Sequence, residues 1–309
     1  MQAVMEWGLQ VIIFIQQFHG PVFDAVVRGI TFLGEEQFYL LFLTALVWAV
    51  NFRMGAGLAV AFLLSAYVNS IVKDTLALPR PFELDPSVGI DTARGGGLPS
   101  GHAQNGFVVW GGLAVWGQRR WLWVVAVAVI VLLGFSRIYL GVHFPTDVLG
   151  GYAIGAVLLW LYLRFQQTVP DAVRGLPLAG QIGVTVLVPI VLALVWTTAD
   201  TVSAMGTLAG LGVGLVLKHR YVPFDAGGPG WQRAIRFLVG AAGLLVFYVG
   251  LSALFPREGE ALYAVFRFFR FGLLGAWVSL GAPWIFRQLK LAQAPRGPLV
   301  AGFGVGPQR

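Results

Sequence analysis

The sequence contains no cysteine and few charged residues. The absence of cysteine among 309 residues excludes disulfide bonds and thiolate metal sites. Charged side chains make up 11% of the chain, whereas a soluble domain carries about 25%. Hydrophobic residues account for 57%. These proportions exclude an ordinary soluble domain and predict an integral membrane protein.

Acidic residues are scarcer than basic ones, at 14 against 21, and the net charge is +7. In a membrane protein such an excess lies in cytoplasmic loops, so we expect no nucleic-acid partner. The first residues also lack a basic segment, and Glu6, Gln16 and Gln17 interrupt their apolar run. We therefore expect no cleaved signal peptide.

Long apolar runs predict an all-α, polytopic transmembrane helix bundle. Spans are expected over 36–51, 54–77, 101–117, 121–139 and 146–166, and again over 178–197, 200–218, 234–254 and 262–286. Residues 1–34 leave two alternatives open, namely two interfacial amphipathic helices or one first span. The bundle then has a core of about five or six helices and about four additional C-terminal helices.

Polar residues between 166 and 174 interrupt the apolar pattern and indicate a boundary near 167–177. We predict three segments, which are an N-terminal one over 1–34, a core over 35–170, and a C-terminal extension of unknown role over 171–309.

Basic residues recur at every second turn between the expected spans. They are Arg53, Arg119, Arg120, Arg164, Arg174, Lys218, Arg220, Arg233, Arg236, Arg287, Lys290, Arg296 and Arg309. The positive-inside rule makes this face cytoplasmic. The opposite, exterior face then carries Glu35, Glu36, the long loop 78–99, Asp200 and residues 257–260. Three polar clusters open toward that exterior face.

The first cluster pairs Lys73, at the end of an expected span, with Arg80 in the loop that follows. Pro79 and Pro81 stiffen the backbone around Arg80, which favours a fixed guanidinium. A guanidinium binds phosphate oxygens in a bidentate manner, and a lysine adds a point charge. The alternative is that Lys73 only extends toward the membrane interface.

The second cluster is Ser100, Gly101 and His102, at the start of an expected helix. Ser100 suits the N-cap position, and Gly101 allows an anion to approach the free backbone N–H groups. His102 projects from the first turn into the same space, where it suits the role of a general acid. The alternative is an ordinary interfacial histidine.

The third cluster is Arg137, His143 and Asp147. Pro145 suits the first position of a helix, so Asp147 falls in the first turn and can reach back to His143. A carboxylate that holds one ring nitrogen leaves the other free as a nucleophile. Arg137 is placed to meet the anion under attack. The alternative is a capping aspartate beside an interfacial histidine.

Together the clusters predict a phosphate pocket with two histidines, one to attack phosphorus and one to protonate the leaving oxygen. Phosphoryl transfer depends mainly on positioning and on neutralising oxygen charge. We predict no metal site and no cofactor, because three cations around two histidines repel divalent ions.

The clusters read Lys73-x6-Arg80-Pro81, Pro99-Ser100-Gly101-His102 and Ser136-Arg137-x5-His143-x3-Asp147. In order and spacing they resemble the three signature motifs of the type-2 phosphatidic acid phosphatase superfamily. That superfamily includes lipid phosphate phosphatases, polyprenyl diphosphate phosphatases, glucose-6-phosphatase and vanadium haloperoxidases. The resemblance covers residues 35–166, and the C-terminal helices go beyond the six-helix minimum of the family.

The resemblance implies a metal-independent phosphatase in which His143 forms a phosphohistidine, Asp147 orients it and His102 is the general acid. It further implies that phosphate is held by Lys73, Arg80, Ser100, Gly101 and Arg137. We expect a lipid phosphate or diphosphate as substrate and membrane lipids as partners. We also expect a place in the bacterial plasma membrane, with the site on the exterior, periplasmic face. Self-association into a homo-oligomer stays open.

Three other functions remain open at this point. The chain could act on a small soluble phosphate ester, transfer the phosphoryl group to an acceptor other than water, or bind or transport lipid without catalysis. Outside the clusters, Arg267 and Arg270 lie one helical turn apart. Either they extend toward the exterior interface or they contact an anionic lipid.

Overall fold

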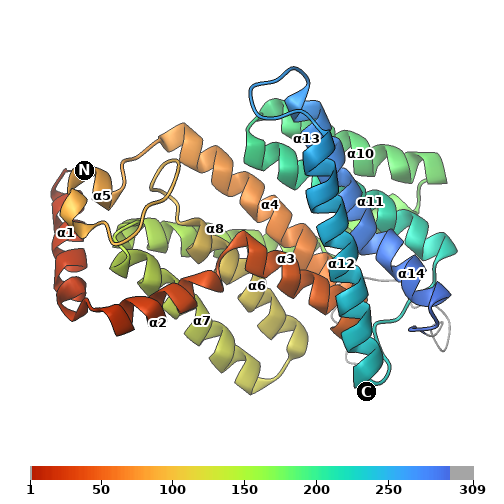
Figure 1. Cartoon of the computed structure of the whole chain (residues 1–309), viewed down its shortest axis with the longest axis horizontal. Helices are drawn as coiled ribbons and strands as arrows, with labels where there is room; N and C mark the ends of the chain where they lie inside the picture. Colours follow the sequence, from red (N-terminus) through yellow and green to blue (C-terminus); the bar gives the residue numbers. More distant parts are fainter. Residues whose placement is uncertain (1, 293–309) are drawn as a thin grey trace. The chain divides into compact units, whose positions relative to one another are not determined.

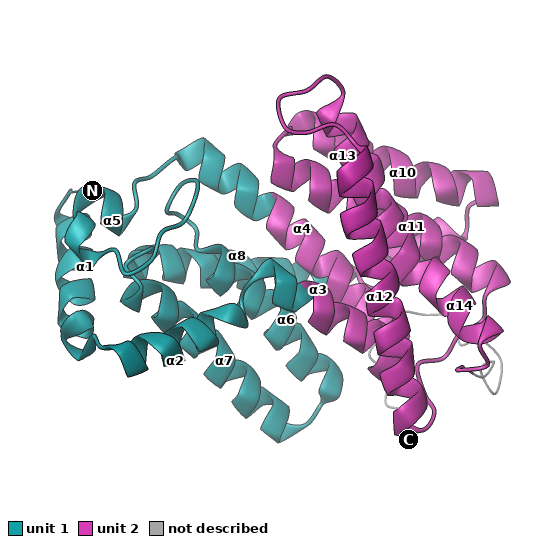
Figure 2. Ribbon diagram, in the orientation of Figure 1, with its two compact units in different colours: residues 1–39, 68–163 teal, residues 40–67, 164–309 magenta. Residues whose placement is uncertain are grey.

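A computed structural model describes residues 2–292, which form helices and loops with no β-strand (Figure 1). The all-α prediction is therefore confirmed. The chain divides into two compact units, shown in teal and magenta in Figure 2. Unit 1 comprises residues 1–39 and 68–163, and unit 2 comprises residues 40–67 and 164–309. Arg296 and Arg309, predicted to be cytoplasmic, lie outside the described residues.

Unit 1 is built from the N-terminal helices and the helices that carry the three clusters. Its elements are α1 (Gln2–Ile15), the short turn η1 (Gln16–Phe18), α2 (Pro21–Phe32), α5 (Pro81–Leu84), the turn η3 (Pro86–Val88), α6 (Gly101–Gly117), α7 (Arg120–Tyr139) and most of α8 (Pro145–Phe165). Three helices contribute residues to both units, namely α3 (Glu36–Ala45), α4 (Phe52–Leu76) and α8, which ends just inside unit 2.

Unit 2 holds the C-terminal helices. They are α9 (Thr168–Arg174), α10 (Leu178–Val195), α11 (Ala199–Tyr221), α12 (Gly230–Leu254), α13 (Tyr263–Ala276) and α14 (Ala282–Gln288). Two π-helical turns complete the unit, η2 (Leu46–Val50) after α3 and η4 (Trp277–Gly281) between α13 and α14.

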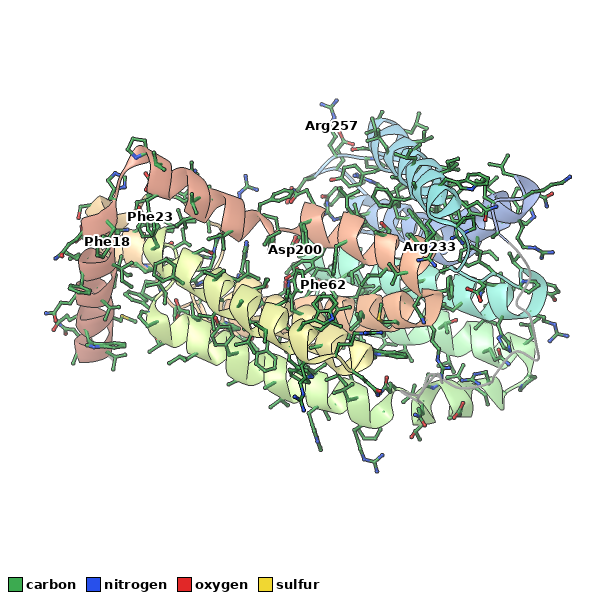
Figure 3. The ribbon with its side chains drawn as sticks, turned by 90° about the horizontal axis from the view of Figure 1, so that it is seen from below. Phe18, Phe23, Phe62, Asp200, Arg233 and Arg257 are labelled. Atoms are coloured by element: carbon green, nitrogen blue, oxygen red, sulfur yellow. The ribbon has the colours of Figure 1, made fainter. Side chains whose placement is uncertain are left out.

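Within residues 2–292, seven helical segments are long and apolar enough to cross a membrane. The pair formed by α2 and α3–η2, bent by 51°, brings the number to eight. The expected span over 101–117 forms α6, whose 17 residues fall short of the about 20 that a span needs. Large apolar side chains such as Phe18 and Phe23 remain 69% and 37% exposed (Figure 3), as expected for surfaces that meet lipid.

The N-terminal segment forms two helices, α1 and α2, of 14 and 12 residues. Each is too short to span a membrane alone, and their interfacial position remains a prediction. The polar residue Gln16 between them is used inside unit 1. Its amide donates to the carbonyl oxygens of Val88 at 2.8 Å and Tyr139 at 2.7 Å. This contact ties the N-terminal segment to the 78–99 loop.

Prolines and a left-handed residue fix the ends of the helices that bear the clusters. Pro145 occupies the first position of α8, where its missing N–H costs no hydrogen bond. The sequence-based expectation for this position is therefore confirmed. At the other end of α6, Gln118 takes a φ of 48°, which cannot continue the helix.

Arg236 differs from its expected place in a cytoplasmic loop. It lies within α12 at 0% exposure, whereas Arg233 one turn earlier is exposed (Figure 3). Its guanidinium donates to the carbonyl oxygens of Asp225, Ala226 and Gly227 at 2.9, 2.7 and 2.8 Å. The loop before α12 thus obtains hydrogen-bond donors that its own backbone does not supply.

Glycines allow α11 to pack directly along α13 and the turn η4 (Figure 1). Gly206, Gly210 and Gly214 recur every four residues of α11. A Cβ added at Gly210 lies 1.7 Å from the carbonyl oxygen of Gly272. This small-residue stripe is typical of helix contacts in membranes, where backbones approach closely.

We therefore expect Gly210→Ala to destabilise the protein by about 1–3 kcal/mol through overpacking. Gly250→Ala in α12 is the matched control, because no atom lies within 4 Å of a Cβ added there. That substitution should be neutral or stabilising, since alanine favours helix. Thermal unfolding in detergent measures both, and equal melting temperatures for the two variants would contradict the close helix contact.

Candidate functional site

All eight residues predicted to form the site lie in unit 1, at helix ends or in the adjoining loops. Their places are Lys73 in the last turn of α4, Arg80 before α5, Ser100, Gly101 and His102 at the start of α6, Arg137 in the last turn of α7, His143 in the next loop, and Asp147 in the first turn of α8. The contacts described below join most of them into one polar region.

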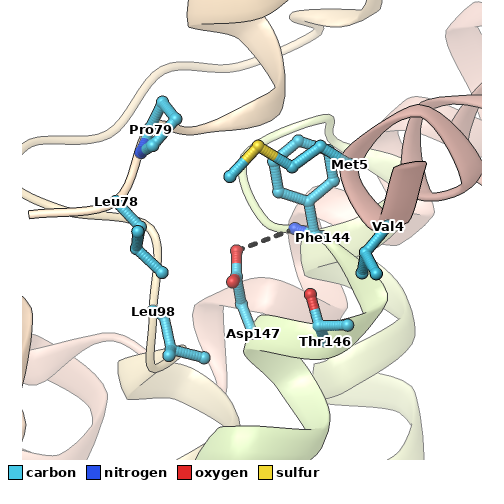
Figure 4. A pocket seen from close by; sticks show the side chains of 8 residues that line it. All are labelled: Val4, Met5, Leu78, Pro79, Leu98, Phe144, Thr146 and Asp147. Carbon is cyan, nitrogen blue, oxygen red and sulfur yellow. Dashed lines mark hydrogen bonds between the residues drawn. The ribbon is translucent and has the colours of Figure 1, made fainter. Parts of the chain in front are cut away.

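His143 and Asp147 form the predicted pair. The ring Nδ1 of His143 lies 3.4 Å from Oδ2 of Asp147, and both side chains are almost completely buried. The same Oδ2 accepts the backbone N–H of Phe144 at 2.9 Å (Figure 4). Asp147 is therefore fixed by the backbone of the turn that carries His143, and it can in turn orient the imidazole.

The other ring nitrogen of His143 contacts Arg80. Nη1 of Arg80 lies 3.2 Å from Nε2 of His143. A guanidinium can only donate hydrogen bonds, so Nε2 accepts and carries no proton. The proton of a neutral ring must then be on Nδ1, which faces Asp147. These two contacts together define the tautomer that a nucleophilic Nε2 requires.

Arg80 is held by backbone carbonyl groups and is 1% exposed. Its Nε donates to Gly95 O at 2.8 Å, Nη2 to Arg94 O at 2.7 Å, and Nη1 to Val142 O at 2.8 Å. The guanidinium is therefore fixed, as the flanking prolines predicted. It also connects the 78–99 loop to the loop that carries His143.

Two buried donors in this region have no hydrogen-bond partner among residues 2–292. They are the Ser100 hydroxyl and Nε of Arg137. Nη1 of Arg137 donates to the Thr31 hydroxyl at 2.7 Å, and the Ser100 backbone N–H donates to Asp147 O at 3.0 Å. Buried unpaired donors are costly, so an acceptor-rich group such as phosphate is the natural complement to this region.

Ser100 occupies the N-cap position of α6, but its side chain makes no capping hydrogen bond. The predicted N-cap position of Ser100 is therefore confirmed. The expectation that its hydroxyl caps the helix is wrong.

Gly101 lets α6 begin directly beside the end of α4. A Cβ added to Gly101 lies 3.1 Å from Oδ1 of Asn69 and 3.8 Å from Nζ of Lys73. Asn69 donates to Pro99 O at 3.3 Å and to Oε1 of Gln104 at 2.9 Å. Asn69 was not predicted from the sequence, although its position one turn before Lys73 places it on the same face of α4.

Glu35 is a second residue that the sequence analysis left out of the site. Its Oε1 lies 3.3 Å from Nε2 of His102, in the break between α2 and α3. A Cβ added to the neighbouring Gly34 lies 2.4 Å from the His102 ring, so the break packs against the imidazole. Glu35 could have been predicted from the sequence as a site candidate, because it is an acidic residue between two apolar segments.

Burial is the largest cause that holds the pKa of His143 well below its usual range, followed by the charges of Arg80, Lys73 and Arg137. His143 lies in the loop between α7 and α8. A lowered pKa keeps the ring neutral at physiological pH, and the neutral ring has a lone pair available for attack.

A cavity of about 300 Å³ lies beside Asp147 (Figure 4). Apart from Asp147 and Thr146 its lining is apolar, formed by Val4, Met5, Leu78, Pro79, Leu98 and Phe144. Residues of α1 thus lie near the His143–Asp147 pair. Within residues 2–292, no group of three or more His, Asp or Glu side chains is placed to hold a metal. That the site uses no metal stays a prediction.

Two family models match the sequence. Residues 54–171 match the family described as PAP2 superfamily, and residues 202–294 match the one described as PAP2 superfamily phosphatase, transmembrane extension. The first match contains all eight predicted site residues, and the second covers most of the helices that go beyond the six-helix minimum.

Individual proteins are similar over part of the chain. Lipid phosphate phosphatase delta of Arabidopsis thaliana is 28% identical over 53% of this chain and 43% of its own length. Phosphatidylglycerophosphatase B of Bacillus subtilis is 29% identical over 48% of this chain and 78% of its own. The chain therefore spans less than half of the Arabidopsis relative.

Among solved structures, the chain is similar to a transmembrane PAP2-type phosphatidylglycerolphosphate phosphatase from Bacillus subtilis. The TM-score is 0.47 and the identity 26%, over 53% of this chain and 87% of that one.

We expect Arg80→Lys to lower the melting temperature and to expose the 78–99 loop. Lysine keeps the charge but cannot reach the three carbonyl groups of residues 94, 95 and 142, and each lost hydrogen bond costs about 1 kcal/mol. Arg28→Lys is the control, because Arg28 also donates to this loop, at Ile90 O, but is exposed. Faster tryptic cleavage at Arg94 in the first variant only is the expected result, and equal cleavage contradicts the anchoring role of Arg80.

Proposed function

Because the chain belongs to the PAP2 superfamily, we propose that it is an integral membrane phosphatase that hydrolyses a lipid phosphate or diphosphate without a metal ion. The observation that carries this proposal is the set of donors around His143. An unprotonated Nε2 lies beside Arg80, and two buried donors, the Ser100 hydroxyl and Nε of Arg137, have no partner in the described chain. A tetrahedral phosphate supplies acceptors for these donors and a target for the nitrogen.

In the first step, Nε2 of His143 forms a bond to phosphorus while the bond from phosphorus to the lipid oxygen breaks. His102 gives its proton to that oxygen, so the leaving group departs as an alcohol or, from a diphosphate, as a lipid monophosphate. Asp147 holds Nδ1–H and stabilises the charge that the ring acquires. Lys73, Arg80 and Arg137 neutralise the equatorial oxygens.

In the second step, water attacks the phosphohistidine. The water proton passes to His102, the bond between nitrogen and phosphorus breaks, and inorganic phosphate leaves. His143 returns to its neutral form, and the protonation of His102 is restored for the next cycle.

Glu35 is a positioning residue in this scheme. Its carboxylate contacts Nε2 of His102 and so selects the orientation of the ring. The arrangement parallels that of Asp147 with His143, with one carboxylate for each imidazole. The two carboxylates come from different elements, the α2–α3 break and the first turn of α8.

A lipid substrate and an exterior site are part of the proposal. The basic residues at alternate turns favour an exterior position for the 78–99 loop. The apolar cavity beside Asp147 offers a surface for the hydrocarbon part of a substrate. Both relatives named above carry a lipid or phospholipid phosphate in their names.

The test is phosphate release by the purified full chain from lipid phosphates, lipid diphosphates and soluble esters, with EDTA present. We expect release from the lipids, complete loss in His143→Ala, and intermediate activity in Asp147→Asn, which changes the tautomer but keeps the nucleophile. His219→Ala is the control, because His219 is exposed in unit 2. Near-normal release by His143→Ala contradicts the mechanism.

Other outcomes of the same assay would favour one of the alternative functions over a lipid phosphatase. Release from soluble esters alone indicates a different substrate class, and phosphoryl transfer to an added alcohol indicates a transferase. Loss of activity in EDTA that is restored by metal contradicts the metal-independent scheme.

The role of His102 is tested by the leaving group. A general acid contributes about 10²–10⁴-fold to the departure of an alkoxide, whereas an aryl oxide needs the proton less. His102→Ala should therefore slow hydrolysis of an alkyl lipid phosphate far more than that of an aryl phosphate, and Glu35→Gln should change the ratio in the same direction by less. Glu6→Gln, at an exposed residue, should leave it unchanged. Equal slowing of both substrates by His102→Ala would assign His102 to phosphate binding instead.

A further inference from the structure

A second cavity, of about 390 Å³, lies in unit 2 where α11 and α13 begin. Its lining combines hydroxyl, charged and small apolar side chains, namely Thr197, Thr198, Ala199, Val202, Glu258, Tyr263, Ala264 and Arg267. Each of these helices begins a segment that is long and apolar enough to cross a membrane. The cavity is therefore at the end of two spans, at the level where lipid headgroups meet a membrane protein.

The Arg267 guanidinium is fixed at this cavity. Its Nε donates to Ala199 O at 2.8 Å and to the Ser203 hydroxyl at 2.7 Å, and Nη1 donates to the Tyr263 hydroxyl at 2.5 Å. The rings of Tyr263 and Phe271 lie 5.6 and 5.2 Å from the guanidinium carbon. These contacts orient Arg267 before any ligand binds, which reduces the entropy that binding costs.

Within the part of the chain that the structure describes, Arg267 forms no ion pair. Among residues 2–292, no carboxylate oxygen lies within 4.0 Å of its nitrogens, and Nη2 donates to no protein atom. A cation at the edge of a low-dielectric region favours an anionic partner. A phosphate oxygen matches a guanidinium in geometry as well as in charge.

Glu258 brings a negative charge to the same cavity. It is exposed, and within the described chain it forms no ion pair with any cation, Arg267 included. The cavity thus presents two opposite charges that form no ion pair with each other in the described chain, together with a patch of Ala199, Val202 and Ala264. A ligand that carries both a phosphate and an ammonium group, on an apolar body, complements all three features.

We propose that this cavity binds the headgroup of a zwitterionic aminophospholipid, with the phosphate on Arg267 and the ammonium group toward Glu258. The site shares no residue with the phosphate pocket of unit 1 and does not depend on the proposed phosphatase activity. It gives the C-terminal extension a defined role, which is to bind a structural lipid of the surrounding membrane.

The experiment measures the melting temperature of the purified, delipidated full chain in detergent, with phosphatidylethanolamine, phosphatidylglycerol or diacylglycerol added. A ligand of the folded state raises the melting temperature with its concentration. We expect the largest rise with phosphatidylethanolamine, a smaller one with phosphatidylglycerol and none with diacylglycerol. Soluble phosphoethanolamine at the same concentration should have no effect, and an equal rise with it would overturn the lipid assignment.

Substitutions test whether the rise in melting temperature comes from lipid bound at this cavity. Arg267→Gln should weaken binding of both phospholipids about tenfold or more, since a charge-assisted hydrogen bond is lost. Arg270→Gln is the matched control, because Arg270 lies in the next turn against the rings of Tyr248 and Phe271 and does not line the cavity. A wild-type response in Arg267→Gln, or an equal loss in Arg270→Gln, would overturn the proposal.

Glu258→Gln tests the ammonium contact and keeps the proposal falsifiable if Arg267→Gln does not fold. Glu258 lies in an exposed loop without hydrogen-bond partners in the described chain, so we expect its substitution to leave the fold intact. We expect this variant to bind both phospholipids equally, through the phosphate alone. An unchanged preference for phosphatidylethanolamine would contradict the zwitterionic ligand.

Discussion

The arrangement of unit 1 depends on the burial of one guanidinium. Arg80 is 1% exposed and contacts the backbone of the 78–99 loop, the backbone of the loop after α7, and the His143 ring. A buried cation is tolerated only where acceptors surround it, so these loops are compelled to present their carbonyl oxygens to it. The same contacts hold His143 near Asp147, because the loop after α7 that carries His143 ends where α8 begins. Loop conformation and the geometry of the His143–Asp147 pair therefore have a common origin.

Each unit uses a buried arginine in the same way. Arg236 in unit 2 donates to three consecutive carbonyl oxygens, as Arg80 does to carbonyl groups of two loops in unit 1. Irregular backbone near the membrane leaves carbonyl groups that water cannot reach. A guanidinium with five donors on one rigid plane satisfies several of them at once, which a lysine cannot do. Part of the basic excess of the sequence is thus structural.

Much of the fold could be predicted, because its determinants are local. Apolar runs gave the positions of the helices, Pro145 fixed the start of α8, and a four-residue spacing placed Asp147 beside His143. Contacts between distant residues could not be predicted in this way. Glu35 contacts His102, which lies 67 residues later in the sequence, and Asn69 contacts Gln104, which lies 35 residues later. No periodicity links such pairs, since the packing of whole helices brings them together. The direction of the Ser100 hydroxyl was missed for a related reason, because the N-cap position alone does not determine a side-chain rotamer.

The contact between Arg80 and His143 also bears on the protein at rest. With Nε2 engaged by a guanidinium N–H, the lone pair that attacks phosphorus in the proposed reaction is already occupied. When a phosphoryl group arrives, its oxygen is a better acceptor for the guanidinium than an imidazole nitrogen is. In the proposed reaction, the exchange of that single hydrogen bond releases the lone pair, so that substrate binding itself makes the His143 nitrogen available for attack.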